Sequence, residues 1–214
     1  MPDTQDQVVL TAAELSYLIA SSPSTTQLGS RAAEVVGLTS DERHEASVSA
    51  GFSSLIARGL AISDGNQVTL APSTSAVSDA LSQSQVNIQI GLVAAERADG
   101  AILFKSERVR LLLSPRRHRC FDLVGLDPRG DLPGQLLAIT RDFLGRYRPG
   151  VVTIVVDTAG RGTPSDLGWT TVAADTDAQS WSVVFGREPS DIDRGVGEEQ
   201  AVHRMRGRLQ ELLA

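Results

Sequence analysis

One short segment has the residue types of a nucleotide-hydrolysing site. Residues 157–161 read DTAGR and follow the apolar run 151–156, as in the metal-facing strand of signal-recognition-type GTPases. Such an enzyme also needs the loop G-x-x-x-x-G-K-[ST], whose backbone amides hold the phosphates while its lysine reaches the terminal phosphate. The only lysine is Lys105, and Asp99 and Phe104 stand where that loop needs glycines. The sequence therefore disfavours a GTPase, and a strand that ends in a glycine-permitted turn accounts for the segment.

Acidic pairs in the last third of the chain could do other chemistry. They are Asp175 with Asp177, Asp191 with Asp193, and Glu198 with Glu199. Two carboxylates at such spacing can share a metal ion or act as acid and base. No histidine or glycine-rich calcium loop accompanies them, so a solvated acidic linker is the simpler interpretation. The enzyme hypothesis predicts instead that the four aspartates converge in a deep polar pocket.

Cys120 is the only cysteine and follows the basic segment 114–119, SPRRHR. A single cysteine makes no internal disulfide, and three scattered histidines form no zinc ligand set. The basic neighbours could activate the thiol, or Cys120 could be a small apolar residue at the start of a strand. His118 and His203 lack a nucleophile in a recognisable motif, and no G-x-S-x-G elbow occurs. We expect no catalytic residue, no metal and no cofactor, and the basic segment is either a solvated hairpin turn or a contact for an acidic partner.

Charge is unevenly distributed along the 214 residues. Residues 1–90 carry nine acidic and three basic side chains, while residues 91–214 carry seventeen of each. The N-terminus has no basic and apolar leader, and no apolar run reaches the roughly 18 residues of a membrane span. We therefore expect a cytoplasmic protein without a membrane span.

The first third of the chain has helical periodicity. Thr11 with Glu14 forms a capping box at the start of a helix. Residues 31–36 and 41–60 predict two more helices. Residues 60–72, LAISDGNQVTLAP, predict two strands around an Asp-Gly turn. Three helices and a hairpin occur in this order in a winged helix.

We expect two parts, an N-terminal helical unit with a hairpin at residues 1–82 and a sheet with helices at 83–214, packed as one compact domain. Alternation at 86–124 predicts a four-stranded antiparallel meander. A helix capped by Asp131, further strands, an acidic linker and an amphipathic terminal helix follow. Strands followed by a helix occur twice, at residues 86–145 and 151–214, but no internal repeat is clear enough to name. The predicted fold class is α+β, a central and mostly antiparallel sheet flanked by helices, with a winged-helix-like N-terminal unit.

A winged-helix transcriptional regulator with an attached ligand-binding or dimerisation domain is one functional hypothesis. Binding to DNA depends on phosphate neutralisation by Lys and Arg. The expected recognition helix at 41–60 carries Asp41, Glu42 and Glu45 against Arg43 and Arg58, within an acidic third of the chain. Nucleic acid is therefore a disfavoured partner.

The order of several segments resembles the EspG family, the cytosolic chaperones of actinobacterial type VII (ESX) secretion. These segments are LTAAEL, SLIARGLAISDG, VSDALSQSQVNIQIGLVAA, AILFKSERVRLLL, VDTAGRGTPSDLGWTTVAA and RGRLQELLA. The resemblance implies a central, mostly antiparallel sheet flanked by helices, with two pseudo-twofold halves. It also implies a protein without enzymatic activity that keeps a helical secretion substrate, PE/PPE- or WXG-like, soluble until export. It marks no binding residue in this sequence. We expect a cytoplasmic chaperone or adaptor that binds a helical secreted protein, and a homodimer is a further possibility.

Overall fold

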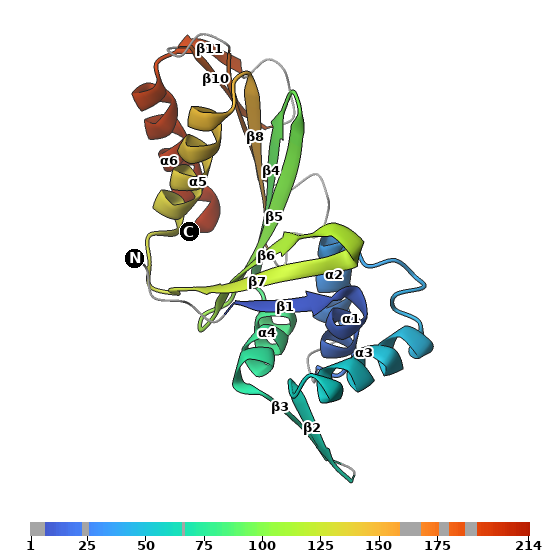
Figure 1. Cartoon of the computed structure of the whole chain (residues 1–214). Coiled ribbons are helices and arrows are strands. Elements are labelled where there is room, and N and C mark those ends of the chain that lie inside the picture. Colours follow the sequence, from blue (N-terminus) through green and yellow to red (C-terminus); the bar gives the residue numbers. More distant parts are fainter. Residues whose placement is uncertain (1–6, 23–25, 66, 159–167, 176–179, 187–191) are drawn as a thin grey trace. The chain divides into compact units, whose positions relative to one another are not determined.

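The computed structural model describes residues 7–22, 26–65, 67–158, 168–175, 180–186 and 192–214 (Figure 1). The chain divides into two compact units. The first comprises the residues up to Gln85 together with Ile102–Pro128, and the second comprises Val86–Ala101 and Arg129–Ala214.

The secondary structure alternates helices and antiparallel strands. The first unit contains β1 (Val8–Thr11), α1 (Ala12–Ala20), α2 (Thr26–Val36), α3 (Glu45–Ala57), β2 (Ala61–Asp64), β3 (Gln67–Leu70), α4 (Pro72–Gln83), β6 (Arg110–Pro115), a 3-10 turn (Arg117–Arg119) and β7 (Cys120–Leu126). The second contains β4 (Val86–Ala94), α5 (Leu132–Arg146), β8 (Gly150–Thr158), β9 (Gly168–Ala174), β10 (Trp181–Phe185), β11 (Ile192–Val196) and α6 (Glu198–Leu213). Strand β5 (Arg97–Lys105) begins in the second unit and ends in the first.

Nine of the described strands form one sheet in the order β1-β7-β6-β5-β4-β8-β9-β10-β11. From the middle of the sheet, β4, β5, β6 and β7 follow one another toward one edge, where β1 is the last strand. Strands β8, β9, β10 and β11 follow one another toward the other edge. Each of these two series of four strands leads into a helix, α5 or α6. The predicted α+β class with a mostly antiparallel sheet flanked by helices is confirmed.

The order of three helices and a hairpin at the N-terminus is also confirmed. The predicted boundary between residues 82 and 83 lies close to Gln85, where the chain leaves the first unit. Residues Ile102–Pro128 belong again to the first unit. Each unit therefore consists of two separate stretches of the chain, which one boundary in the sequence cannot represent.

Aliphatic and aromatic side chains from helices and strands form the core of the first unit. Leu15 and Leu18 of α1 meet Phe104, Leu113 and Phe121 of the strands in one cluster, and all five are at most 1% exposed. Strand β1 joins this core because Leu10 lies opposite Phe121 in the antiparallel register with β7. The burial of these large side chains is the main stabilising contribution to the unit.

A buried carboxylate joins β1 and α1 to α3 and its C-cap. The side chain of Glu14 is fully buried and accepts hydrogen bonds from the backbone N–H of Thr11 (2.8 Å), the hydroxyl of Ser54 (2.7 Å) and the guanidinium of Arg58 (2.9 Å). Burial raises the pKa of the Glu14 carboxyl, but these hydrogen bonds outweigh it and leave the pKa below its usual value. Arg58 also donates to the carbonyl of Val9 (2.9 Å). Glu14 is therefore both the predicted capping-box residue and a link between distant segments.

The crossing of α1 and α3 depends on a glycine. A Cβ at Gly51 would lie well inside van der Waals contact with the carbonyl group of Ala13. Next to this point the rings of Tyr17 and Phe52 stack with centroids 4.9 Å apart. The absent side chain lets the helix backbones approach closely enough for Ser54 and Arg58 to reach Glu14.

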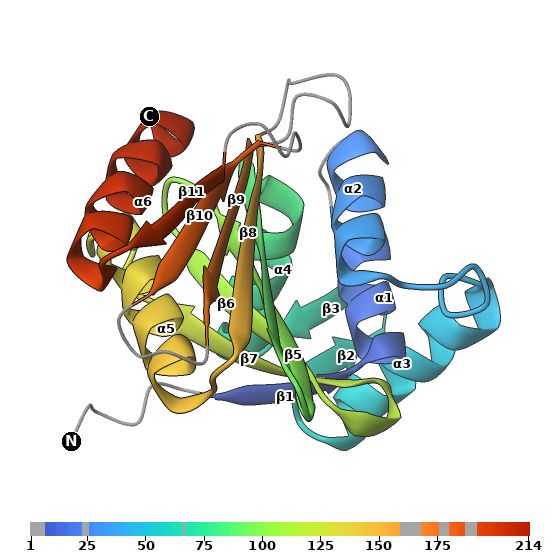
Figure 2. The ribbon, with the colours of Figure 1, turned by 90° about the horizontal axis from the view of Figure 1, so that it is seen from above.

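In the second unit, α5 and α6 pack against each other and against strands β8, β9 and β10 (Figure 2). Helix α6 buries Ala201, Met205 and Leu209 on one face. It approaches β9 so closely that a Cβ at Gly168 would overlap the side chain of Leu212. Two ion pairs link α5 or its cap to α6, Arg141 with Glu198 (2.8 Å) and Arg206 with Asp131 (2.6 Å).

Three elements differ from the sequence-based expectation. The acidic linker expected before the terminal helix contains strand β11, which pairs antiparallel with β10 and brings Asp193 opposite Val183. Strand β1 and helix α4 were not predicted either. Helix α4 has no side-chain cap at Ala71 and begins at Pro72. The serine- and threonine-rich sequence of α4 favours turns in isolation, and its burial against the first unit overrides that preference.

Replacing Gly51 by alanine tests the α1/α3 crossing. We expect Gly51→Ala to lower the free energy of unfolding by about 1–3 kcal/mol, because the added methyl group forces the two helices apart. Urea denaturation followed by circular dichroism measures this change. In the control Gly145→Ala, in α5, nothing lies within 4 Å of the new Cβ. We expect that control to gain about 0.5–1 kcal/mol, and an equal response of the two variants would contradict the role given to Gly51.

Candidate partner-binding surfaces

A two-stranded ribbon, formed by residues 61–70, is fixed firmly at its base. Ala61 is 2% exposed, and the carbonyl of Leu60 accepts hydrogen bonds from the backbone of Ala71 (3.0 Å) and the hydroxyl of Thr74 (2.6 Å). The backbone N–H of Leu60 in turn donates to Leu55 in α3 (2.8 Å). The base of the ribbon is therefore held between α3 and α4.

Beyond this base the ribbon exposes apolar side chains on both faces. Ile62 is 68% exposed and Val68 is 43% exposed, and they are two of the four exposed large apolar residues in the described part of the chain. Ile62 lies opposite Thr69, and Val68 lies opposite Ser63, so the two apolar side chains point to opposite faces. Two single apolar side chains on opposite faces form no contiguous patch, so the ribbon is a candidate binding surface by the exposure of these two residues alone.

The sequence predicted the turn of this ribbon but not its exposure. The expected turn is present: β2 ends at Asp64, and Gly65 follows with a φ of +58° that favours glycine. Short apolar strands are equally common in a buried sheet, so alternation alone did not identify Ile62 or Val68 as candidate binding residues. The exposure follows from tertiary packing, which covers Ala61, half-buries Leu70 and leaves the other residues of both strands exposed.

The basic segment 114–119 comprises the last two residues of β6 and the loop that leads to β7, and two of its arginines bind residues of the same unit. Arg116 pairs with Asp122 at 2.6 Å. Arg119 pairs with Glu42 at 2.6 Å and donates to the carbonyl of Gly37 at 2.9 Å. Much of the predicted positive patch is therefore used to fix the loop on the protein. Arg117 and His118 remain exposed at its tip.

Two consecutive residues of this loop have left-handed backbone conformations. His118 has a φ of 60° and Arg119 a φ of 56°, which is unusual for residues other than glycine. The hydrogen bonds of Arg119 to Glu42 and Gly37 provide a local reason why the loop keeps this conformation. Cys120 begins β7, as expected, and is a half-buried free cysteine.

Two of the four candidate aspartates, Asp175 and Asp193, lie in the described part of the chain, and each has a partner of its own. Asp193 pairs with Arg204 of α6, and the carboxylate of Asp175 accepts a hydrogen bond from Ser180 (3.4 Å). Asp177 and Asp191 lie outside the described residues. Among the residues that the structure describes, no three His, Cys, Asp or Glu side chains gather as metal ligands would. The convergence of four aspartates therefore stays a prediction.

The DTAGR segment begins inside a strand. β8 continues to Thr158, two residues beyond the predicted end, and Asp157 lies opposite Asn87 of β4 in the register. Residues 159–161 lie outside the described part of the chain. Asp157 is thus part of the antiparallel β4–β8 pairing and not the first residue of a turn.

The segment expected to recognise DNA carries two arginines, and the charge of one of them, Arg58, is neutralised within the protein. Its C-terminal Arg58 binds the carboxylate of Glu14, and the side chain of Arg43 donates to the carbonyl of Thr39 (3.4 Å). Glu45 lies in the first turn of α3. This arrangement gives no support to the regulator hypothesis.

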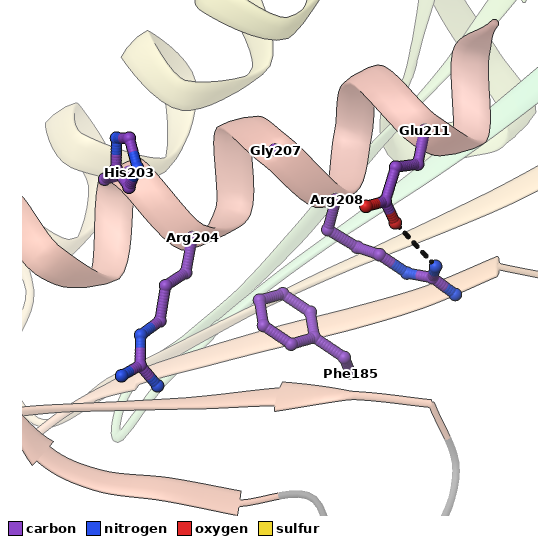
Figure 3. A pocket seen from close by; sticks show the side chains of 6 residues that line it. All are labelled: Phe185, His203, Arg204, Gly207, Arg208 and Glu211. Carbon is purple, nitrogen blue, oxygen red and sulfur yellow. Dashed lines mark hydrogen bonds and ion pairs between the residues drawn. The ribbon is translucent and has the colours of Figure 1, made fainter.

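A second candidate surface, the α6 groove, is a concave site between α6 and β10 in the second unit (Figure 3). It has a volume of about 590 Å³ and is lined by Phe185, His203, Arg204, Gly207, Arg208 and Glu211. Phe185 points from β10 toward the helix, between the side chains of Arg204 and Arg208 (Figure 3). The amphipathic pattern of α6 predicted a buried apolar face. It did not indicate that the polar face of the helix lines a groove.

No protein-family model and no curated protein sequence matches this chain. Among solved structures, the Mycobacterium tuberculosis type VII secretion system chaperone EspG5, determined in complex with a PE25-PPE41 dimer, is similar with a TM-score of 0.58. The match covers 97% of this chain and 95% of that chain at 6% sequence identity. The likeness is one of fold.

No helix in the described part of the chain is long and apolar enough to cross a membrane. At 6% identity, the likeness to EspG5 assigns no role to individual residues of this chain. The candidate surfaces therefore rest on exposure, shape and charge in this structure alone.

The Glu42–Arg119 contact predicts a loss of stability in acid. The hydrogen bond from Arg119 lowers the pKa of Glu42 from its usual value of 4.5 to about 2. A depressed pKa stabilises the folded state above pH 4.5, and this contribution disappears as the pH falls toward 2. Because Arg119 is half exposed, we expect about 1–2 kcal/mol after solvent screening.

Urea unfolding of the wild-type protein and of Glu42→Gln, measured between pH 7 and pH 3, tests this contribution. The variant should be less stable at pH 7, and the difference should shrink at low pH. A difference that is independent of pH would show that the charge of Glu42 is not its source.

Proposed function

We propose that this chain is a non-enzymatic, cytoplasmic chaperone or adaptor that binds a helical secreted protein, as EspG-type chaperones of type VII secretion do. The fold likeness to EspG5, which extends over nearly the full length of both chains, is the observation that carries the proposal. That neighbour was determined with a bound PE25-PPE41 dimer. A client of the same kind, PE/PPE- or WXG-like, is the partner we propose here.

The ribbon is the client-binding element of this proposal. A helical client that aggregates when alone needs its apolar surface covered before export. Ile62 and Val68 supply apolar contact area on a projecting element whose base is rigidly hydrogen-bonded to α3 and α4. Full burial of such side chains contributes about 1.5–3 kcal/mol each.

Co-expression with candidate clients tests the function. The tagged protein is produced with small helical secreted proteins encoded near its own gene, and the complex is isolated at moderate salt. We expect a near-stoichiometric complex that remains soluble. The chaperone hypothesis would be wrong if every candidate client stayed insoluble or failed to co-purify with the tagged protein.

Replacing the exposed apolar residues of the ribbon tests the site. The double variant Ile62→Ser, Val68→Ser should bind the client at least tenfold more weakly, because both apolar contacts are lost. Its thermal midpoint should stay close to that of the wild type, since both side chains are exposed. Thr69→Ser, on the same ribbon, is the matched control and should bind normally. Undiminished binding by the double variant would move the client to another surface.

A further inference from the structure

The backbone of the ribbon has two edges that no other described strand covers. The N–H of Ala71 donates to the carbonyl of Leu60 (3.0 Å), so residues 60 and 71 face each other as a hydrogen-bonded pair. In an antiparallel pairing such residues alternate with residues whose N–H and C=O groups point away from the partner strand. The outward-pointing residues are Ala61 and Ser63 on β2, and Val68 and Leu70 on β3.

Strand β3 lacks the features that keep edge strands from pairing. Bulges, charged side chains and prolines are the usual protection of a sheet edge. Strand β11, an edge of the large sheet, has such protection: its register with β10 is irregular, Gly195 has a φ of +66°, and Asp193 and Arg194 carry charges. Strand β3 reads QVTL and contains no charged residue and no proline. Figure 1 shows that the ribbon extends away from α3 and α4, so nothing in these helices covers its far part.

The β3 edge is complementary to a second copy of itself. If two copies pair antiparallel with Thr69 opposite Thr69, Val68 of each copy lies opposite Leu70 of the other. Because both residues point their N–H and C=O groups outward, each such pair exchanges both of its N–H···O bonds. Each pair also brings two apolar side chains together, and the two threonines face each other, which are favourable cross-strand contacts. The charged residue of the ribbon, Asp64, lies on β2 and away from this pairing.

We propose that the β3 edge of the ribbon binds the β3 edge of a second copy of this chain. The two ribbons form a four-stranded antiparallel sheet in the order β2-β3-β3-β2, with a two-fold axis at Thr69. Two short strands bury less than the roughly 1,200 Å² of a standard interface, so this dimer is weak and forms at high protein concentration. The proposal concerns the chain alone and does not rest on the chaperone function.

Cysteine cross-linking of the full chain tests the register. In a Cys120→Ser background, Thr69→Cys places two thiols opposite each other in a non-hydrogen-bonded pair. The Cα atoms of such a pair lie about 4.5 Å apart, which a disulfide can span. With oxidised glutathione, we expect a covalent dimer to form at least tenfold faster than from Ser63→Cys, which is also exposed but lies on the β2 edge. Equal rates for the two variants would overturn the proposal.

Proline substitutions distinguish the β3 edge from the β2 edge. Val68→Pro and Ser63→Pro each remove an outward-pointing N–H, a change that an edge strand tolerates. Sedimentation velocity should show concentration-dependent dimers of the wild type and of Ser63→Pro, and association at least tenfold weaker for Val68→Pro. A wild type that stays monomeric at about 1 mM, or an equal loss in both variants, would contradict the proposal. Both experiments use the chain without a client, so their failure would leave the chaperone proposal intact.

Discussion

The buried carboxylate of Glu14 organises the first unit. Burying a charge is unfavourable unless hydrogen bonds and an opposite charge compensate for it. Here Thr11, Ser54 and Arg58 provide that compensation, and Gly51 provides the close helix approach that lets two of them reach. Because α3 leads directly into Leu60 and the ribbon, the same contact also fixes the segment from which the exposed apolar side chains project.

Local sequence patterns predicted those features whose causes are local. The capping box of Thr11 and Glu14, the turn at Gly65 and the cap of α5 at Asp131 each depend on residues within a few positions of one another. The other partners of Glu14 lie 40 and 44 residues away, a separation that periodicity does not encode.

The missed elements show the same limit. The acidic pair Asp191 and Asp193 predicts a solvated linker in the place where β11 lies. Its pairing with β10 and the ion pair of Asp193 with Arg204 make it a strand. The candidate surfaces were missed for a related reason. Ile62 is exposed, and the space above Gly207 is open, because no distant segment of the described chain packs over them.

Arg58 also affects the edge strand of the sheet. β1 is the outermost strand on its side, and the unpaired backbone of such a strand invites strands of other molecules to add to it. The guanidinium of Arg58 already occupies the carbonyl of Val9 on this strand. Arg58, which neutralises the buried carboxylate of Glu14, thus also blocks one backbone acceptor of the edge strand. A strand of another molecule that accepts or donates hydrogen bonds at Val9 would first have to displace this guanidinium.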